Sequence, residues 1–323
     1  MSSHAVGIDL GGTNLKGALV HIEEGIVDFT QRRTEADQGP EHVVDRIADL
    51  TADLMAQAPS PVVGVGIGSP GAINWDRTTV TRPPNLPGWD TIDLNAKLRA
   101  TLPQNAPVIV ENDANVAALG SAFHGAGQSY DSFIMVTLGT GVGGGIIYRN
   151  QIFRGSTGGA AEIGHMTIDY EGPFANSGVA GAIEGYLGQS FLSDHARKRL
   201  VNYPESALHD LVDGNLDQLN PRLLYEAATN GDEAARDILA WAGHKLGCVL
   251  GSAVNLLDIR TVIVGGGVSA AGDFILEPAR ETLPSFVVPS LRTDLSVLQE
   301  VLGNEVSLLG AARLAFEGRD AQV

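Results

Sequence analysis

The sequence predicts an α/β fold in which two related domains face each other across a cleft. A short unit of strand, Gly/Thr turn and strand occurs at residues 5–21 and again at residues 132–148. We interpret this repeat as an internal duplication. Apolar runs of strand length also alternate with helical apolar stripes, which is typical of α/β proteins. At 323 residues the chain is long enough for about two domains.

Composition narrows the class of protein. Hydrophobic residues make up 44% of the chain, which supports real cores, and the 40 glycines cluster after apolar runs, where the backbone can approach a ligand closely. The net charge of −17 disfavours a nucleic-acid partner. A single cysteine, Cys248, excludes a disulfide within the chain and a thiolate metal cluster. The sequence shows neither a signal-peptide pattern nor a membrane-spanning apolar run, so we expect no membrane partner and a cytoplasmic location.

The first strand, residues 5–9, ends in a glycine turn that leads into a second strand at residues 14–21. Glycines let backbone N–H groups approach an anion, while threonine adds a hydroxyl and lysine a charge. A turn that uses glycine only for its conformation is the alternative. An aspartate at the end of an apolar strand would then be buried without benefit. The candidate phosphate-binding residues are Asp9, Gly11, Gly12, Thr13 and Lys16.

The next elements lead toward the middle of the chain. We expect strands at 26–30 and 62–67 and helices at 41–58 and 94–102. Gly71 follows the second of these strands. The stretch 74–88 reads as irregular, and Asn85 and Trp89 are candidates for a substrate wall. A loop of this composition is more often simply packed against the protein.

The polar stretch Glu111-Asn112-Asp113 separates a strand at 107–110 from a helical stripe that begins at Val116. In open α/β sheets, ligands bind outside the carboxyl ends of the strands. The positive end of a helix keeps an aspartate in its first turn ionised, which suits a catalytic base. The alternative is a plain helix cap, for which Asn and Asp are favoured.

The second half repeats the glycine turn. A strand at 132–138 is followed by Gly139, Thr140 and Gly141 and by another strand at 142–148. Together with Gly144 these glycines match G-x-G-x-x-G, but strand residues follow, so the dinucleotide-binding interpretation fails. A Walker phosphate loop is also excluded, because none of the four lysines follows a glycine.

The remaining motifs follow in order. Glu162 and His165 lie three residues apart after a glycine run and fit either a polar pocket or a surface turn. A helix at 180–188 carries Glu184. A long helix, or a broken pair of helices, at 231–257 has glycines at four-residue spacing, which we interpret as core or subunit interface. We expect a strand at 261–264, the turn Gly265, Gly266 and Gly267, a helix from Ala270 and a final helix at 307–316 on the first domain.

Taken together, these motifs resemble the ROK family of bacterial sugar kinases, within the superfamily of sugar kinases, heat-shock proteins and actin. The stretches 9–13 and 138–143 are similar to its two phosphate loops, and 265–269 to its adenosine loop. The stretch 111–113 matches its catalytic segment, and 162–165 its sugar-binding segment. The resemblance covers nearly the whole chain. It implies two actin-like (ribonuclease H-like) domains around a cleft: a smaller one at 1–117 plus the C-terminal helix at about 304–323, and a larger one at 118–303.

The same resemblance implies an ATP-dependent hexose kinase that phosphorylates the sugar 6-hydroxyl, with glucose as the first expectation. Asp113 would be the general base, and Asp9 would orient Mg²⁺ through water. The two phosphate turns and the turn 265–267 would bind ATP, and a homodimer is expected. The sugar would contact Gly71, Asn85, Asn112, Asp113, Glu162, His165 and Glu184.

One departure from the family pattern concerns zinc. Family members carry a zinc site made of the histidine that corresponds to His165 and three cysteines; here those three positions are Ala175, Ser177 and Ala182. One imidazole with these side chains cannot hold a structural zinc. We therefore expect a zinc-free member in which packing by Phe174 and Ile183 replaces the metal.

The sequence leaves alternative substrates and functions open. Fructose, mannose, allose or an N-acetylhexosamine are alternative substrates, and donors other than ATP are not excluded. Some ROK proteins are sugar-responsive repressors with an N-terminal helix-turn-helix, but this chain enters its first strand at about residue 5. A non-catalytic sugar sensor is a further alternative, although it would not need the base Asp113.

Overall fold

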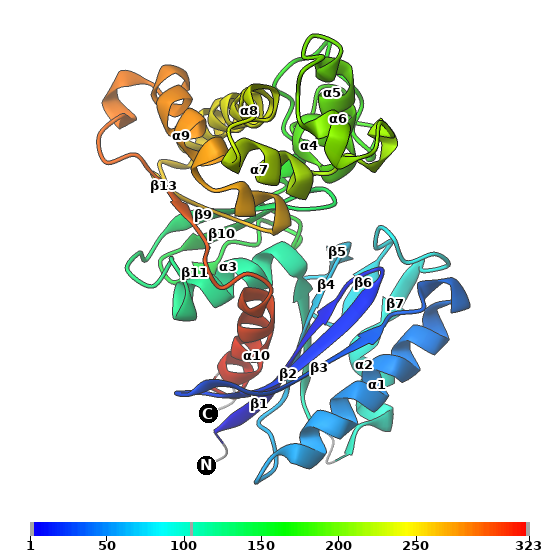
Figure 1. The fold of residues 1–323 in the computed structure, drawn as a ribbon. Helices are drawn as coiled ribbons and strands as arrows, with labels where there is room; N and C mark the ends of the chain where they lie inside the picture. The colour runs from blue at the N-terminus through cyan, green and yellow to red at the C-terminus, as the bar shows by residue number, and fades with distance from the viewer. Residues whose placement is uncertain (1–2, 104–105, 321–323) are drawn as a thin grey trace. The chain divides into compact units, whose positions relative to one another are not determined.

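The computed structural model describes residues 3–103 and 106–320 and has a mixed α/β fold (Figure 1). It divides into two compact units. The first comprises Met1–Asp131, Gly145–Ala160 and Asn304–Val323, and the second Ser132–Gly144 and Ala161–Gly303. The predicted boundary after residue 117 falls inside helix α3 (Asp113–His124), which lies whole in the first unit.

A five-stranded sheet of order β3-β2-β1-β4-β8 forms the centre of the first unit. The first two strands pair antiparallel as predicted, whereas β1, β4 and β8 run parallel, so their carboxyl ends share one edge. The third and fourth strands are β3 and β4; the fourth starts at Val65, later than the predicted residue 62. The strands are β1 (His4–Leu10), β2 (Asn14–His21), β3 (Gly25–Arg33), β4 (Val65–Ser69) and β8 (Val108–Asn112).

Helices cover this sheet through apolar stripes. Helix α1 (Pro40–Gln57) buries Ile47, Leu50 and Leu54 and joins the same core as the strands. Helix α10 (Glu305–Asp320) is the predicted C-terminal helix, and residues 321–323 of that prediction lie outside the described residues. Its backbone comes so close that a Cβ at Gly66 would lie 1.7 Å from the carbonyl oxygen of Ala311. The glycines of the strands therefore permit this helix to pack directly on the sheet.

The stretch that sequence reasoning called irregular contains a small sheet of order β5-β6-β7. Its strands are β5 (Ala72–Ile73), β6 (Thr79–Thr81) and β7 (Thr91–Asp93), followed by α2 (Leu94–Thr101). The strands have two or three residues, too few for a periodic pattern to show. Trp89 is buried in the core of the first unit, so its candidacy as a substrate wall is wrong.

The second unit is built on the sheet β11-β10-β9-β12-β13, in which β12 pairs parallel with both β9 and β13. Strand β10 begins in this unit and ends in the first. The strands are β9 (Phe133–Leu138), β10 (Val142–Tyr148), β11 (Gln151–Ile152), β12 (Thr261–Gly265) and β13 (Ser296–Gln299). The helices are α4 (Glu184–Leu187), α5 (Gln189–Leu200), α6 (Leu208–Leu211), α7 (Pro221–Thr229), α8 (Glu233–Leu257) and α9 (Asp273–Thr282).

Short 3-10 turns complete the fold at Ala36–Gln38, Ile163–His165, Leu216–Gln218, Gly267–Ala271, Leu283–Phe286 and Pro289–Leu291. Two predicted helices differ from what the structure contains. The helix expected at 180–188 is only α4, because Gly181 has a left-handed φ of 61° just before it. The helix expected from Ala270 is a 3-10 turn followed by α9, with Gly272 between them.

The glycine face of the long helix α8 is occupied within the chain. A Cβ at Gly243 would lie 2.3 Å from the carbonyl oxygen of Ile275, and one at Gly247 would lie 2.7 Å from that of Ala279. Both oxygens belong to α9, so these glycines serve a helix contact inside the second unit. They no longer support the predicted homodimer.

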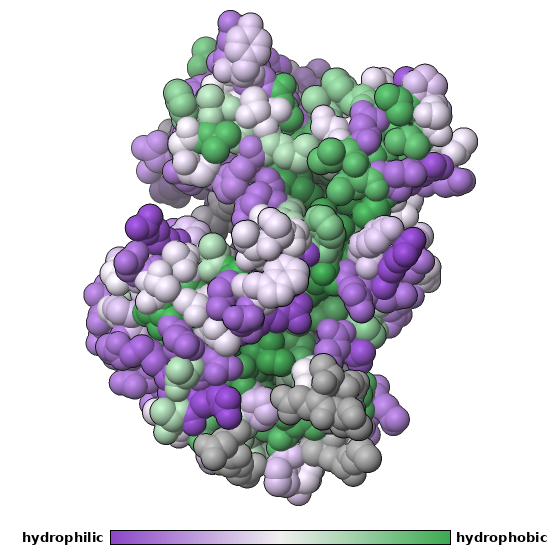
Figure 2. Space-filling model, turned by 180° about the vertical axis from the view of Figure 1, so that it is seen from behind, coloured by the Kyte–Doolittle hydropathy of each residue, from purple (hydrophilic) through white to green (hydrophobic). Residues whose placement is uncertain are grey.

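Hydrophilic residues cover much of the face shown in Figure 2, with hydrophobic residues visible between them. Exposed large apolar side chains include Tyr170, Val201 and Leu256, and apolar atoms on the surface are normal in folded proteins. Within residues 3–103 and 106–320, no helix is both long enough and apolar enough to cross a membrane.

Candidate active site

The carboxyl edge of the parallel strands in the first unit brings together acidic residues from two distant places in the sequence. Asp9 of β1 is paired with Gly68 of β4, which in turn is paired with Glu111 of β8. Neighbouring strands lie about 4.8 Å apart, so the backbones at Asp9 and Glu111 are about 10 Å apart. This edge therefore brings the first glycine turn close to the predicted catalytic segment.

The first glycine turn is held by hydrogen bonds to its backbone. The N–H of Gly11 donates to the carbonyl oxygen of Asn14 at 3.0 Å, and the hydroxyl of Thr34 donates to the carbonyl of Gly11 at 2.6 Å. The Lys16 ammonium lies 3.5 Å from the Asp9 carboxylate. Burial raises the pKa of Asp9, and Lys16 opposes that shift. A carboxylate in this setting gains from a second cation, which fits the predicted role toward Mg²⁺.

Asn85 lies against the same turn. A Cβ at Gly12 would come within 2.7 Å of the Asn85 Cβ and 2.8 Å of its carbonyl oxygen. Asn85 itself has a left-handed φ of 64°, which asparagine tolerates better than most residues. Gly71 has a φ of 93°, and its backbone packs on Pro83. Both predicted sugar-binding residues thus have a left-handed backbone, and Asn85 lies against the glycine turn.

Asp113 is the first residue of α3, and Asn112 is its N-cap. The Asn112 side-chain oxygen accepts the N–H groups of Ala114 and Asn115 at 3.0 and 3.2 Å. The capping role considered for this stretch therefore belongs to Asn112, which leaves only its amide nitrogen for a sugar hydroxyl. Asp113 Oδ1 accepts the Ala114 N–H at 2.9 Å, so the carboxylate sits at the positive helix end.

In the second unit, Val142 connects the second glycine turn to the predicted sugar-binding residues. Its N–H donates to the Glu184 carboxylate at 3.2 Å, and a Cβ at Gly164 would lie 1.8 Å from its carbonyl oxygen. Glu184 also covers Gly141, where a Cβ would lie 2.3 Å from Oε2. The turn 139–141, Glu184 and the turn 163–165 therefore lie together around the start of β10.

The third glycine turn lies beside the second. Gly266 has a φ of 86°, and a Cβ there would lie 2.4 Å from the carbonyl oxygen of Leu138, the last residue of β9. By contrast, a Cβ at Gly139 or Gly267 would meet no atom within 4 Å. Two backbone segments of the second unit are therefore adjacent and open on one side, as a nucleotide site requires.

Glu162 precedes a short 3-10 turn, and His165 is its last residue. The His165 Nε2 atom is 3.6 Å from the Glu162 carboxylate, and its Nδ1 atom is 3.1 Å from the Ser177 hydroxyl. With the Nε2 proton directed at Glu162, Ser177 donates to Nδ1; this tautomer is inferred from the partners. Ser177 occupies one of the three family cysteine positions, so a hydroxyl stands where a zinc ligand would be.

The donor set around His165 does not fit zinc. Ala175 and Ala182 are buried and offer no ligand atom, and no group of three or more His, Cys, Asp or Glu side chains suited to a metal occurs among the described residues. Backbone hydrogen bonds order the loop, including Ile183 N–H to the Met166 carbonyl at 3.0 Å. Ile183 is fully buried as expected, whereas Phe174 is 69% exposed, so its predicted packing role is wrong.

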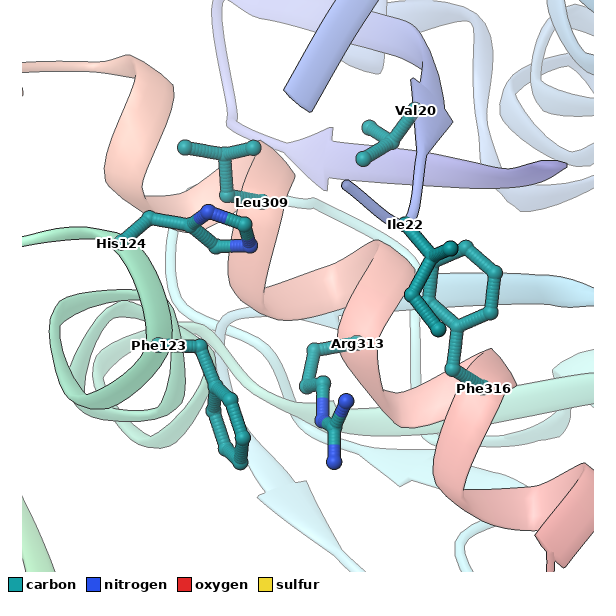
Figure 3. A pocket seen from close by; sticks show the side chains of 7 residues that line it. All are labelled: Val20, Ile22, Phe123, His124, Leu309, Arg313 and Phe316. Carbon is teal, nitrogen blue, oxygen red and sulfur yellow. The ribbon is translucent and has the colours of Figure 1, made fainter. Parts of the chain in front are cut away.

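A separate cavity of about 90 Å³ lies in the first unit between β2, α3 and α10 (Figure 3). Five of its seven lining residues are apolar, and the Arg313 guanidinium lies 3.8 Å from the centre of the Phe123 ring. Burial lowers the pKa of His124, and Arg313 lowers it further. None of the predicted site residues lines this cavity, which consists of Val20, Ile22, Phe123, His124, Leu309, Arg313 and Phe316.

Sequence reasoning missed three contacts at the site. Ser177 was recognised only as a lost cysteine, although a hydroxyl twelve residues after His165 was available as its partner. The ion pairs of Glu111 with Arg77 and Arg154 were also missed. A glutamate directly after an apolar strand was the signal, since a buried carboxylate needs a cation.

Comparison with known proteins places the chain in a family: it belongs to the ROK family, whose model matches residues 5–317. It is 36% identical over 319 residues to a glucokinase of Streptomyces coelicolor, with 97% of each chain covered. It is similar in structure, with a TM-score of 0.85 and 36% identity, to a ROK family glucokinase from Streptomyces griseus in complex with glucose and AMPPNP. That match covers 98% of this chain and 100% of the other. The predicted family and actin-like fold class are therefore confirmed.

A relative of another kind is the xylose repressor of Bacillus subtilis. The identity is 30% over 321 residues, and the match covers 98% of this chain but 78% of the repressor. Family membership alone therefore does not separate a kinase from a regulator, and the residues of the candidate site have to do so.

Proposed function

We propose that this protein is an ATP-dependent hexose kinase that phosphorylates glucose at its 6-hydroxyl. The similarity to glucokinases over nearly the whole chain supports this function. The observation that carries it is Asp113 at the first position of α3, on the sheet edge that also holds the first glycine turn. A sugar sensor of the repressor type needs sugar contacts but no base at this position.

The proposed reaction begins with the sugar hydroxyl. Asp113 takes its proton as the hydroxyl oxygen forms a bond to the γ-phosphorus of ATP. The bond from that phosphorus to the oxygen bridging to the β-phosphate breaks, and ADP leaves with the electron pair. The turn at Gly11 and Gly12 would bind the phosphates, with the Gly12 N–H as donor because the Gly11 N–H already donates to Asn14, and Lys16 would offset negative charge.

Mg²⁺ would neutralise charge on the phosphate oxygens when bound, and Asp9 is the residue that would hold it through water. Residues 139–141 would bind phosphate, and residues 265–267 would bind the adenosine moiety. We propose that the sugar hydroxyls contact Gly71, Asn85, Asn112, Glu162, His165 and Glu184. Homodimerisation and a cytoplasmic location stay predictions.

We also propose that the protein works without structural zinc. The three cysteine positions of the family are here Ser177, which is the partner of His165, and the two alanines Ala175 and Ala182. Elemental analysis of the purified protein should find far less than one zinc per chain. About one equivalent of zinc per chain, retained through dialysis, would contradict the proposal.

The substrate is tested by coupled ADP release with ATP, Mg²⁺ and a panel of glucose, fructose, mannose, allose and N-acetylglucosamine. We expect kcat/KM to be highest for glucose. A higher value for another hexose would reassign the substrate within the same enzyme class. No stimulation by any sugar, together with sugar-dependent increases in Tm, would favour the sensor.

A further inference from the structure

A fully buried carboxylate, Glu111, lies two residues before the proposed base Asp113. Its Oε2 atom lies 2.9 Å from the Arg77 Nε atom and 2.8 Å from the Arg154 Nε atom. Burying a charge is strongly unfavourable unless it is paired, and here two guanidinium groups compensate one carboxylate. The chain therefore places two cations behind its catalytic segment, and the mechanism above uses neither.

The second oxygen of Glu111 contacts the start of helix α3. Oε1 accepts the N–H of Asn112 at 2.9 Å and the side-chain amide of Asn115 at 3.2 Å. Asn112 caps the helix and Asp113 follows it directly. One rigid carboxylate thus joins the two arginines to the turn of backbone that fixes where the Asp113 side chain begins.

Arg154 extends this network to a second segment. Its guanidinium donates to the carbonyl oxygens of Trp75 at 2.6 Å and Asn74 at 2.9 Å, and it lies 5.2 Å from the centre of the Trp75 ring. The Arg154 side chain is only 6% exposed. Arg77 belongs to the same turn, and its carbonyl oxygen accepts the N–H of Val110 on β8 at 2.9 Å. The turn 74–77 is therefore fastened to β8 by both backbone and charge.

The main chain of Arg154 is held as well. Its carbonyl oxygen accepts the N–H groups of Gly158 and Ala160 at 3.1 and 3.3 Å, which shapes the segment that runs on to Glu162 in the sequence. The turn 74–77 likewise lies in the sequence between Gly71 and Asn85. Arg154 thus connects the catalytic segment to two stretches that flank proposed sugar-binding residues.

We propose that Arg154 is a positioning residue for phosphoryl transfer, which acts through Glu111 to fix the segment that carries Asp113. The proposal rests on the proposed function, because it assigns Asp113 the role of base. A base displaced by about 1 Å loses up to roughly 100-fold in rate, so positioning affects turnover more than binding. Lysine supplies the charge of arginine but not its planar fork, so Arg154→Lys should restore only part of the effect.

The experiment compares wild type, Arg154→Met and Arg154→Lys by steady-state kinetics and by calorimetric titration with glucose. We expect kcat to fall roughly 10- to 100-fold in Arg154→Met and less in Arg154→Lys. The Kd for glucose should stay within about twofold, since a positioning residue acts on the transition state. Arg280→Met is the matched control: Arg280 lies on α9, pairs with Asp273 and Glu277, and should leave kcat unchanged.

A folded Arg154→Met protein with wild-type kcat would overturn the proposal, and so would a loss of kcat that Arg154→Lys does not lessen. Equal losses of kcat and glucose affinity would also overturn it, because they indicate general damage. If Arg154→Met does not fold, Arg77→Met replaces it, since Arg77 is more exposed. We expect a smaller loss of kcat there, and an unchanged kcat would count against the network.

Amide hydrogen exchange separates this proposal from the proposed function. In Arg154→Met, amides of residues 108–115 and 74–79 should exchange faster than in wild type, while those of α8 should not change. This result is independent of turnover, so it stands even if wild type phosphorylates no hexose. Unchanged exchange at residues 108–115 would overturn the proposal with or without kinase activity.

Discussion

The segment that carries Asp113 and the segment that carries Glu162 and His165 are held in opposite ways. The first rests on Glu111, which is fully buried and paired with two arginines. The second rests on a hydroxyl, and the side chains of His165 and Glu162 are 35% and 65% exposed. Buried ion pairs resist displacement, whereas an exposed hydrogen bond contributes only about 1 kcal/mol. We conclude that buried ion pairs fix the position of the proposed base Asp113. The positions of the proposed sugar-binding residues Glu162 and His165 depend on weaker local hydrogen bonds.

Replacement of the proposed base Asp113 should have the largest effect on kcat. A small effect would contradict the view that the first segment carries the base. Asp113→Asn keeps the size of the side chain but removes proton acceptance, so kcat should fall by a factor on the order of 10² to 10⁴ while glucose binding persists. Coupled ADP release and calorimetry measure the two quantities. Asp90→Asn, at an exposed ion pair with Arg82, is the matched control. A wild-type kcat in Asp113→Asn would remove Asp113 from the role of base.

The third glycine turn, residues 265–267, offers a matched pair of substitutions. Gly266→Ala places a Cβ 2.4 Å from the Leu138 carbonyl at a φ of 86°, so it should destabilise the protein by on the order of 3 kcal/mol. Gly267→Ala meets no atom within 4 Å and should leave the free energy of unfolding unchanged. Denaturant unfolding measures both. If residues 265–267 bind ATP, Gly267→Ala should still raise the KM for ATP; an unchanged KM would argue against that role.

Replacement of Ser177, the partner of His165, tests the segment that is held by the weaker bonds. Ser177→Ala removes a hydrogen bond worth about 1 kcal/mol, so the KM for glucose should rise about fivefold with little change in stability. Ser177→Thr keeps the hydroxyl and should remain closer to wild type. Steady-state kinetics at saturating ATP measure this. A KM for glucose that is equal in wild type and Ser177→Ala would show that Ser177 does not position His165.

The smallest expected effect concerns pH and a histidine away from the proposed sugar contacts. His195 stacks on Trp241 with ring centres 3.5 Å apart, and burial, then Arg199, Lys198 and Lys245, lower its pKa to about 4. The unfolded state therefore binds the proton first, so stability should fall as pH decreases from about 6.5 toward 4. After allowance for its partial exposure, the loss should be about 1 kcal/mol. His195→Phe keeps the stacking and should weaken this pH dependence in denaturant unfolding; an unchanged pH profile would contradict the assignment.

Sequence patterns predicted much of this fold because its main elements are long and periodic. The apolar stripe of α8 and the strands β1, β2, β9 and β10 were found in this way, and each glycine turn followed a strand. The small sheet β5-β6-β7 was missed, since its strands are too short to be periodic. The glycine spacing of α8 was ambiguous because sequence does not say which surface covers it, and α9 does.

The residues of the candidate site were predicted from the sequence, but the residues that hold them in place were not. Asp9, Asp113 and Glu162 stand at strand ends or after glycines, where local sequence gives a signal. Arg77 and Arg154 lie 34 and 43 residues from Glu111, so only the folded chain brings them together. Phe174 was expected to pack in place of the zinc, yet it is exposed. Long-range charge pairing and the burial of a single side chain are decided by the tertiary fold.

The most direct test of the account measures ADP release from ATP and Mg²⁺ in the presence of glucose or 6-deoxyglucose. The account predicts that glucose stimulates ADP release strongly and yields glucose phosphorylated at the 6-oxygen. It predicts that 6-deoxyglucose, which lacks the attacking hydroxyl, competes with glucose without stimulating release. Equal stimulation by both sugars, or by neither, would contradict a kinase in which Asp113 activates the 6-hydroxyl.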